Sequence, residues 1–155
     1  MGNNKGMMSS NTYEWETPLD LFDKLNAEFH FDLDPCATHE NKKCLTFFTI
    51  DDDGLEQEWF GSVFMNPPYG NLIAKWIEKA FLESQKVSIR SVVCLLPART
   101  DTRWFHDYCM LANEIRFIKG RLRFSGMDPA PFPSMIVIFK RCRNKILEVR
   151  TYGTD

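Results

Sequence analysis

The chain has 155 residues, of which 44% are hydrophobic and 14% aromatic, enough for one folded domain with its own core. A charged fraction of 26% excludes a disordered chain. The longest apolar runs, such as 92–96 and 135–139, exclude a membrane-spanning protein, because a helix that crosses a bilayer needs about 20 apolar residues. The net charge of −2 is divided unevenly, since residues 1–90 carry 8 basic and 15 acidic side chains whereas residues 91–155 carry 11 and 6.

The first half of the chain predicts a helix followed by three strands. Residues 1–12 are expected to form a flexible tail, and residues 13–155 a single compact domain. Thr17 and Pro18 are typical of a helix start, because a hydroxyl can cap the first turn and proline fits the first helical position. Apolar residues then repeat at helical spacing as far as Phe29. Strands are predicted at 29–34, 45–50 and 62–65, and the third runs directly into two prolines, which end it.

The second half alternates helices with strands. Residues 71–86 carry an apolar stripe at helical spacing, and the opposite face of that helix carries Lys75, Glu78, Lys79 and Glu83. A strand at 91–96, a helix capped by Thr100 or Asp101, and strands at 115–118, 135–140 and 146–149 follow. This alternation predicts an α/β fold with a mixed, mostly parallel sheet and helices on both faces. Ligands of such sheets bind at the carboxyl ends of the strands.

The basic half mixes cations with aromatic rings, a combination that contacts phosphates and bases in nucleic-acid-binding proteins. The cations are Arg99, Arg103, Arg116, Lys119, Arg121 and Arg123, and the rings are Trp104, Phe105, Phe117 and Phe124. The same pattern fits an amphipathic helix followed by a strand, with the arginines in solvent and the rings in the core. This segment alone leaves both interpretations open.

The five cysteines predict a location rather than a bound metal. They stand at positions 36, 44, 94, 109 and 142, an odd number that includes no Cys-x-x-Cys pair. This usage favours a reducing cytoplasm over a disulfide framework. Cys36, His39 and Cys44 lie close in sequence, but their spacing fits no zinc pattern and a fourth ligand is missing, so no metal site is predicted.

The segment Asn66-Pro67-Pro68-Tyr69 is the most specific chemical signal in the sequence. Following a buried strand, it would hold an amide, a carbonyl and a ring at the ligand-binding edge. The amide oxygen of Asn66 and the backbone carbonyl of Pro67 can accept the two N–H groups of a planar amino nitrogen, which favours a pyramidal nitrogen with a free lone pair. Pro68 would keep the turn rigid, and Tyr69 would stack on the flat group. The alternative is a stiff turn with a packed tyrosine.

This chemistry suits methylation of a planar amino nitrogen on adenine, cytosine or an amide, with S-adenosylmethionine as the methyl donor. The motifs that surround the segment resemble those of amino-methyltransferases of the adenine-N6 type, and the longer string resembles the phage-encoded Dam-like DNA N-6-adenine methyltransferases. The motifs that carry this resemblance are WETP (15–18), FDLD (31–34), DPCA (34–37), NPPYG (66–70), LLPART (95–100), WFH (104–106), GRL (120–122) and FPSM (132–135). The resemblance implies a Rossmann-like class I methyltransferase fold.

By this resemblance, Asn66, Pro67, Pro68 and Tyr69 would be the catalytic residues. The resemblance implies that S-adenosylmethionine is held by Trp15, Thr17, Pro18, Asp34, Pro35, Cys36 and Ala37. One carboxylate of residues 51–53, for which we expect Asp53, would accept hydrogen bonds from its ribose or adenine. One departure concerns the turn after the first strand, where Thr38-His39-Glu40 replaces the glycine-rich turn usual in methyltransferases.

A methyltransferase fold uses about the whole length of this chain, so base recognition is expected from loops such as 99–103 and 121–133. Double-stranded DNA, with the target adenine flipped out, would meet a set of four arginines: Arg99, Arg103, Arg121 and Arg123. A phage-encoded enzyme would act in the cytoplasm of the host, and both a monomer and a homodimer are compatible with the sequence. The alternatives are a glutamine-amide or RNA amino methyltransferase and a catalytically inactive DNA-binding module.

Overall fold

The computed structural model describes residues 15–124, 128–141 and 146–153, so the predicted tail at 1–12 lies outside the described residues. The helices are α2 (Leu19–Phe29), α3 (Ile73–Ser84), α4 (Arg103–Asp107) and the 3-10 helix η1 (Cys109–Leu111). The strands are β1 (Leu33–Asp34), β2 (Thr46–Phe47), β3 (Gly61–Met65), β4 (Ile89–Pro97), β5 (Glu114–Ile118), β6 (Ser134–Phe139) and β7 (Glu148–Tyr152). None of the helices in these ranges is long and apolar enough to span a membrane.

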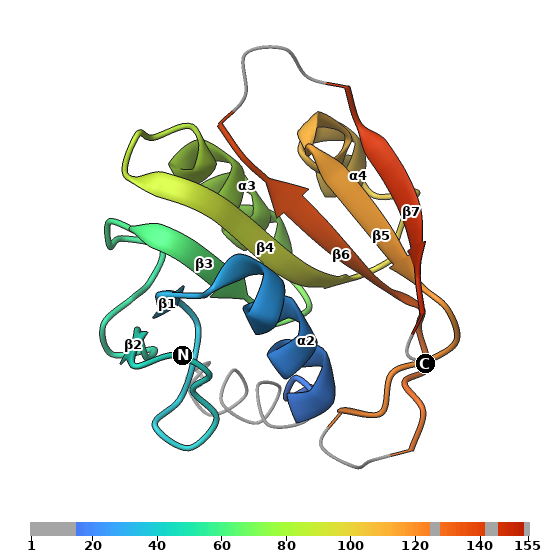
Figure 1. The fold of residues 1–155 in the computed structure, drawn as a ribbon, viewed down its shortest axis with the longest axis horizontal. Coiled ribbons are helices and arrows are strands. Elements are labelled where there is room, and N and C mark those ends of the chain that lie inside the picture. The colour runs from blue at the N-terminus through green and yellow to red at the C-terminus, as the bar shows by residue number, and fades with distance from the viewer. Residues whose placement is uncertain (1–14, 125–127, 142–145, 154–155) are drawn as a thin grey trace.

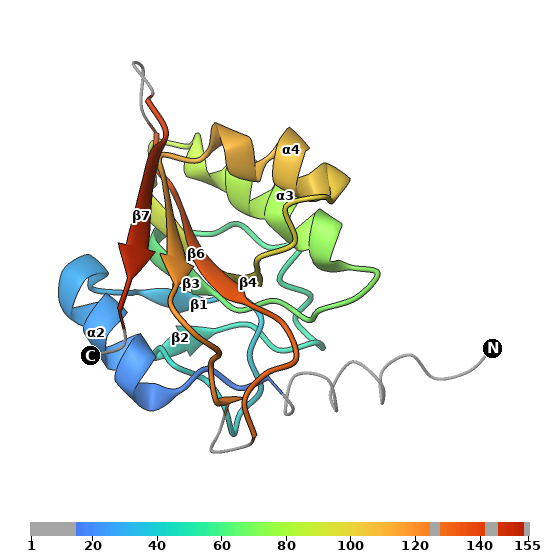
Figure 2. The same ribbon diagram turned by 90° about the vertical axis from the view of Figure 1, so that its right-hand side faces the viewer.

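The described strands form one sheet in the order β2-β1-β3-β4-β6-β5-β7 (Figure 1). The pairs β1–β2, β1–β3, β3–β4 and β5–β7 are parallel, whereas β6 runs antiparallel to both β4 and β5. Helix α2 lies on one face of the sheet, and α3 and α4 lie on the other (Figure 2). The predicted α/β, Rossmann-like arrangement, with a mixed, mostly parallel sheet and helices on both faces, is confirmed.

The hydrophobic core has two halves because side chains of the central strands point alternately to the two faces of the sheet. Val92 and Cys94 of β4 pack with Ile77 of α3, whereas Val93 and Leu95 of the same strand belong to the half that also contains Leu21, Phe22 and Leu25 of α2. A strand covered on both faces reads as an uninterrupted apolar run, as residues 92–97 of β4 do. The helices therefore hold the central strands, and with them the edge where those strands end.

The first strand is shorter than the alternation at 29–34 predicts. Helix α2 continues through Phe29 and ends at His30, whose left-handed φ of 52° turns the chain. Asn26 accepts hydrogen bonds from the two backbone N–H groups that follow the helix. Its backbone carbonyl accepts from the His30 N–H at 2.9 Å, and its side-chain oxygen accepts from the Phe31 N–H at 2.9 Å. The apolar residues just after the helix thus belong to its termination, and only Leu33 and Asp34 pair as β1.

Glu83 corrects the prediction that it lies on the solvated face of α3. Its side chain is only 3% exposed, and its carboxylate accepts hydrogen bonds from Lys79 Nζ at 2.9 Å, Lys86 Nζ at 2.7 Å and the Trp59 N–H at 3.1 Å. Burial acts to raise the pKa of Glu83, but the bonds from Lys86 and Lys79 outweigh it and the pKa is lowered. A buried carboxylate is tolerated because it is fully paired.

Three parallel strands of the sheet, β1, β3 and β4, end at a common edge, with Asp34, Met65 and Pro97 as their last residues. The segments that follow them contain Cys36, Asn66 and Arg99. The parallel pairing is therefore what brings the segments 34–37 and 66–69, distant in the sequence, to one place.

Candidate active site

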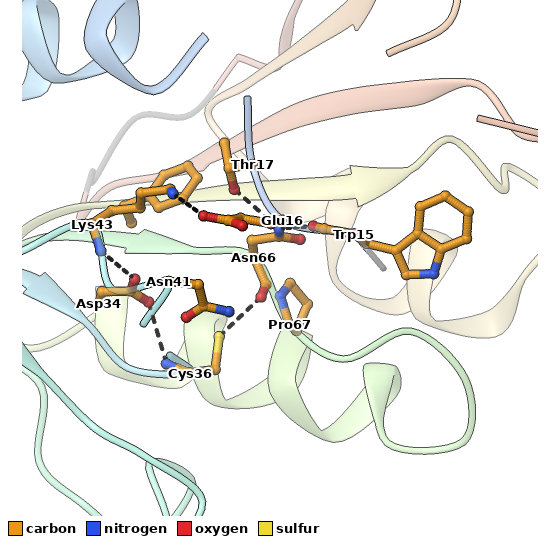
Figure 3. A pocket seen from close by; sticks show the side chains of 10 residues that line it. Trp15, Glu16, Thr17, Asp34, Cys36, Asn41, Lys43, Asn66 and Pro67 are labelled. Carbon is orange, nitrogen blue, oxygen red and sulfur yellow. Dashed lines mark hydrogen bonds and ion pairs between the residues drawn. The ribbon is translucent and has the colours of Figure 1, made fainter. Parts of the chain in front are cut away.

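Asn66, the first residue after β3, has its side-chain amide held in a single orientation (Figure 3). Nδ2 donates to the backbone carbonyl of Trp15 at 2.7 Å and to Thr17 Oγ1 at 3.0 Å. A carbonyl oxygen only accepts, so the nitrogen end of the amide must face Trp15. The other end, Oδ1, is buried and has no hydrogen-bond partner in the described part of the chain. Such an acceptor is uncommon in a folded protein and marks a place where a donor is missing.

Thr17 serves a different purpose from the helix cap that its sequence neighbourhood predicts. The residue at the cap position of α2 is Pro18, and no side chain caps that end of the helix. The Thr17 hydroxyl instead accepts a hydrogen bond from Asn66, and Thr17 is only 4% exposed. The segment before α2 is therefore part of the site rather than only the start of a helix.

The segment after β1 supports the backbone of Asn66. Cys36 Sγ donates to the Asn66 carbonyl at 3.2 Å, while Asp34 Oδ1 accepts from the Cys36 N–H at 3.4 Å and Oδ2 from the Lys43 N–H at 3.1 Å. Burial raises the pKa of the Cys36 thiol well above its ordinary value, so the sulfur carries its proton and can donate. The loop after β1 thus fixes both the position of Lys43 and the peptide that carries the Asn66 amide.

A small polar cavity lies between these segments. Its wall is formed by ten residues: Trp15, Glu16, Thr17, Asp34, Cys36, Asn41, Lys43, Phe64, Asn66 and Pro67. Lys43 Nζ and Glu16 Oε1 form an ion pair of 2.9 Å on this wall, joining the segment before α2 to the loop after β1. Lys43 and Asn41 are site residues that the sequence did not point to, because neither stands in a recognisable pattern.

Asp34 is expected to make the stability depend on pH. Burial raises its pKa from 3.8 to about 6, against the lowering effect of the backbone N–H groups of Lys43 and Cys36. Between these values the folded protein holds a proton that the unfolded chain has lost, so the free energy of unfolding falls as the pH rises. The total fall is about 3 kcal/mol, at about 1.4 kcal/mol for each unit of pKa.

Urea unfolding of the wild type and Asp34→Asn at pH 4, 5, 6 and 7 measures this effect. The stability of the variant relative to the wild type should rise through this window and then level off. Asp20→Asn, which changes an exposed acid of α2, controls for the loss of one charge. A wild-type-minus-variant difference that stays constant from pH 4 to 7 would rule out the raised pKa.

A larger and more apolar hollow of about 200 Å³ adjoins the first on the far side of the proline turn. It is lined by Cys36, Ala37, Thr38, His39, Glu40, Thr49, Ile50, Asp51, Pro68 and Trp76. The two cavities share Cys36, and the proline turn contributes Pro67 to one and Pro68 to the other. Trp76 Nε1 is buried and has no hydrogen-bond partner within the described ranges. The wall of this hollow therefore combines the indole of Trp76 with an acidic side chain, Asp51.

The acid that the structure places on this wall is Asp51. Asp53, the residue expected from the sequence, is exposed two positions further along the turn, at a left-handed φ of 57°. Asp52 is engaged within the turn, where its carboxylate accepts from the Thr49 N–H at 2.8 Å and the Thr49 hydroxyl at 3.1 Å. Of the predicted cofactor residues, Pro35 is buried, with its backbone carbonyl oxygen against Gly54.

The turn that replaces the glycine-rich loop is built by side chains. The Thr38 N–H donates to Asn41 Oδ1 at 2.6 Å, and the Asn41 N–H donates to Thr38 Oγ1 at 3.1 Å. These reciprocal bonds satisfy the backbone of the turn in the way that capping side chains do at helix ends. The departure from the usual loop therefore still gives an ordered wall for the hollow.

Tyr69 belongs to an aromatic cluster beside Asn66. Its hydroxyl donates to the Leu95 carbonyl at 3.3 Å, and burial raises its pKa, so the hydroxyl stays neutral. Its ring lies edge-on to Phe132, with centroids 5.5 Å apart, and near-parallel to Trp15, with centroids 6.5 Å apart. Trp15 also packs edge-on against Phe132 and Phe124. The ring of Tyr69 is thus anchored at one end and flanked by aromatic faces.

The four arginines expected to meet DNA are all exposed, in segments that follow β4 and β5. Arg99 and Arg103 follow β4, and Arg121 and Arg123 follow β5. The latter two line a third hollow together with Pro18, Asp20, Leu21, Lys24, Leu122, Tyr152 and Gly153. Lys24 was not singled out from the sequence, because a lysine on an amphipathic helix carries no signal of its own.

Arg116 corrects the idea that every cation of the basic segment faces a polyanion. It is 7% exposed and forms a two-pronged pair with Glu28, at 2.6 and 2.7 Å, besides a bond to Glu114 at 2.8 Å. Trp104, Phe105 and Phe124 are buried as well. The core interpretation is confirmed for these three rings, whereas the buried, paired Arg116 fits neither interpretation and the exposed arginines leave the other one open.

Comparison with protein families gives one match over nearly the whole chain. A model described as DNA N-6-adenine-methyltransferase (Dam) matches residues 6–153. Among curated proteins, the DNA N-6-adenine-methyltransferase of Escherichia phage T1 is 32% identical over 115 residues, which cover 70% of this chain and 45% of that protein. The chain therefore spans less than half the length of this relative.

Two further similarities are more limited. YfdM of Escherichia coli (strain K12), which carries the name of a methyltransferase, is 34% identical over 64 residues, covering 36% of this chain and 70% of that protein. Among solved structures, a predicted O-methyltransferase from Agrobacterium tumefaciens superposes with a TM-score of 0.39 and 19% identity, over 69% of this chain and 52% of that one.

Proposed function

Because the chain belongs to the DNA N-6-adenine-methyltransferase (Dam) family, we propose that it transfers a methyl group from S-adenosylmethionine to the N6 amino group of adenine in DNA. The observation that carries this proposal is the buried Oδ1 of Asn66, which has no hydrogen-bond partner among the described residues. It is an acceptor without a donor, held at the edge of the sheet by two hydrogen bonds to the other end of its amide. An exocyclic amino group is the donor it lacks.

The role proposed for Asn66 is to make a poor nucleophile reactive. The lone pair of an exocyclic amino group is delocalised into the ring, and two acceptors that bind its N–H groups favour the pyramidal form, which frees the lone pair. Asn66 Oδ1 and the Pro67 carbonyl would be these acceptors, and Pro68 would keep the turn that carries them rigid. Tyr69 would stack on the flipped base, since its hydroxyl is tied to Leu95 and its ring flanks the site.

The residues present fit the proposed cofactor. S-Adenosylmethionine supplies an electrophilic methyl group on a sulfonium centre when it is bound. Its adenosine part has ribose hydroxyls, which can donate to a carboxylate, and a flat apolar base. The apolar hollow offers the carboxylate of Asp51 and the indole of Trp76 for these groups. Residues expected nearer the methionine part are Trp15, Asp34 and Cys36, which line the polar cavity. We propose Asp51, in place of Asp53, as the acid of this set.

DNA binding through the exposed arginines has a measurable salt dependence. If each of Arg99, Arg103, Arg121 and Arg123 neutralises one phosphate, the logarithm of the binding constant should fall by about 0.9 per contact for each decade of salt. In the double variant Arg121→Gln, Arg123→Gln the slope should be smaller by the share of two contacts, about 0.9 for each. Fluorescence anisotropy with a labelled duplex at 50 to 300 mM salt measures it. Arg90→Gln, an exposed arginine at the opposite end of β4, is the matched control.

If the double variant leaves the slope unchanged, DNA does not bind at Arg121 and Arg123. This result would leave the cavity chemistry untouched, because Arg121 and Arg123 are exposed outside both cavities next to Asn66.

The proposal is tested by incubating the protein with methyl-labelled S-adenosylmethionine and unmethylated duplex DNA, then digesting the DNA to nucleosides. Label in N6-methyldeoxyadenosine is the expected result. Label in RNA or in protein glutamine under matched conditions, with none in DNA, would move the activity to those substrates. Binding of DNA without binding of the cofactor would leave the inactive binding module.

A further inference from the structure

The geometry points to Thr17 as the positioning residue of the reaction: together with the Trp15 carbonyl it fixes the Asn66 amide so that Oδ1, and not Nδ2, is presented to the substrate. This inference rests on the proposed function for the role of Oδ1. It assigns Thr17 to Asn66 rather than to the cofactor, to which the sequence resemblance assigned it.

The two ends of an asparagine amide have nearly the same size, so packing alone does not select between them. The Trp15 carbonyl does select, because the reversed amide would place two acceptor oxygens 2.7 Å apart. Thr17 Oγ1, at 3.0 Å, accepts the second hydrogen of the same nitrogen. With both N–H groups bound, the amide plane cannot rotate, and the direction of the free oxygen is set before any substrate arrives.

The segment that carries these two acceptors is itself held at both ends. On one side, the Trp15 ring packs edge-on against Phe132 at 4.9 Å and Phe124 at 5.3 Å. On the other side, the Pro18 carbonyl accepts from the Phe22 N–H at 3.0 Å and so joins the segment to α2. Leu21, Phe22 and Leu25 bury α2 against the sheet. The acceptors therefore have a rigid support, as positioning groups require.

Thr17 can be replaced without changing its shape. Thr17→Val removes the acceptor and keeps the volume, whereas Thr17→Ser keeps the acceptor. In Thr17→Val the methylation rate at saturating cofactor should fall about ten- to a hundredfold, the scale on which small misplacements of a reacting group act. The dissociation constant of S-adenosylmethionine should stay within about twofold, because one N–H of the amide is still held. Thr17→Ser should recover most of the rate, and Thr151→Val, an exposed threonine of β7, should leave it unchanged.

Single-turnover methylation and isothermal titration of the cofactor separate the two quantities. A weaker cofactor affinity with a normal rate at saturation would overturn the inference and return Thr17 to the cofactor. A normal rate and a normal affinity in Thr17→Val would overturn it as well.

A second measurement does not depend on activity. The side-chain N–H signals of Asn66 in a ¹H–¹⁵N spectrum, identified by their loss in Asn66→Ala, should exchange slowly with solvent in the wild type because both hydrogens are bonded. In Thr17→Val one of them should shift and exchange faster, whereas Thr17→Ser should restore it. Unchanged signals in Thr17→Val overturn the inference. If these signals behave as expected while the wild type methylates no DNA, the proposed function fails and the positioning contact stands.

Discussion

Asn66→Ala should lower the rate of adenine methylation by at least about a hundredfold, the usual effect of removing a group that binds the reacting atoms in the transition state. The alanine has no acceptor where Oδ1 stands, so the target nitrogen keeps its planar, unreactive form. The affinity for S-adenosylmethionine should change little, because the other residues that line the two cavities remain. Single-turnover rates at saturating cofactor and DNA, with cofactor titration in parallel, measure both quantities.

Asn71→Ala is the matched control for this variant. Asn71 is exposed just beyond the proline turn, so its removal tests the loss of an amide at nearly the same place in the chain. Urea unfolding of both variants measures how much stability is lost because the Trp15 carbonyl has no donor in Asn66→Ala. A folded Asn66→Ala protein that methylates DNA at a near-normal rate would show that Oδ1 does not bind the target amino group.

Tyr69→Ala should lower kcat/KM for DNA by about ten- to a hundredfold, since a base stacked on an aromatic ring contributes about 1–3 kcal/mol. Tyr69→Phe keeps the ring and loses only the bond to the Leu95 carbonyl, so its loss should stay within about fivefold. The comparison separates stacking from the hydroxyl. Steady-state methylation of a duplex, with DNA as the varied substrate, measures the effect.

Tyr108→Ala controls for the loss of a packed ring. Tyr108 contacts Phe81 in the half of the core on the α3 face, away from the aromatic cluster beside Asn66. Its removal should affect stability without affecting kcat/KM for DNA. Equal losses in Tyr69→Ala and Tyr69→Phe would assign the function to the hydroxyl. In that case the anchoring bond to Leu95, rather than stacking, would be what the reaction needs.

The order of the elements and their meeting at one edge follow from local patterns. Helical spacing places Trp76, Ile77 and Ala80 on the buried side of α3, and the apolar run at 92–96 gives the centre of β4. Prolines after β1 and β3 break the chain where the structure has turns. Since parallel strands end at the same edge, the sequence also predicts that the segments after them meet, as those at 34–37 and 66–69 do.

Partners distant in the sequence could not be predicted in the same way. Thr17 looks like a helix cap because a cap is what its neighbours suggest, yet its partner is Asn66, 49 positions away. Arg116 looks like a free cation, but it pairs with Glu28, 88 positions away. A local pattern reports which groups are polar. It does not report which groups the fold brings within 3 Å, so the sequence alone missed these contacts.

The reversal of β6 bears on how the substrate preference of an enzyme with the proposed activity can change. Because β6 runs antiparallel between β4 and β5, the connection from Ile118 to Ser134 leaves the ligand-binding edge and returns to it. Arg121, Arg123 and Phe132 lie on that connection. Lengthening it adds surface next to Asn66 while every strand keeps its register, and loops tolerate insertion far better than strands do. This connection is therefore the natural place for evolution or engineering to graft a reader of longer DNA sequences.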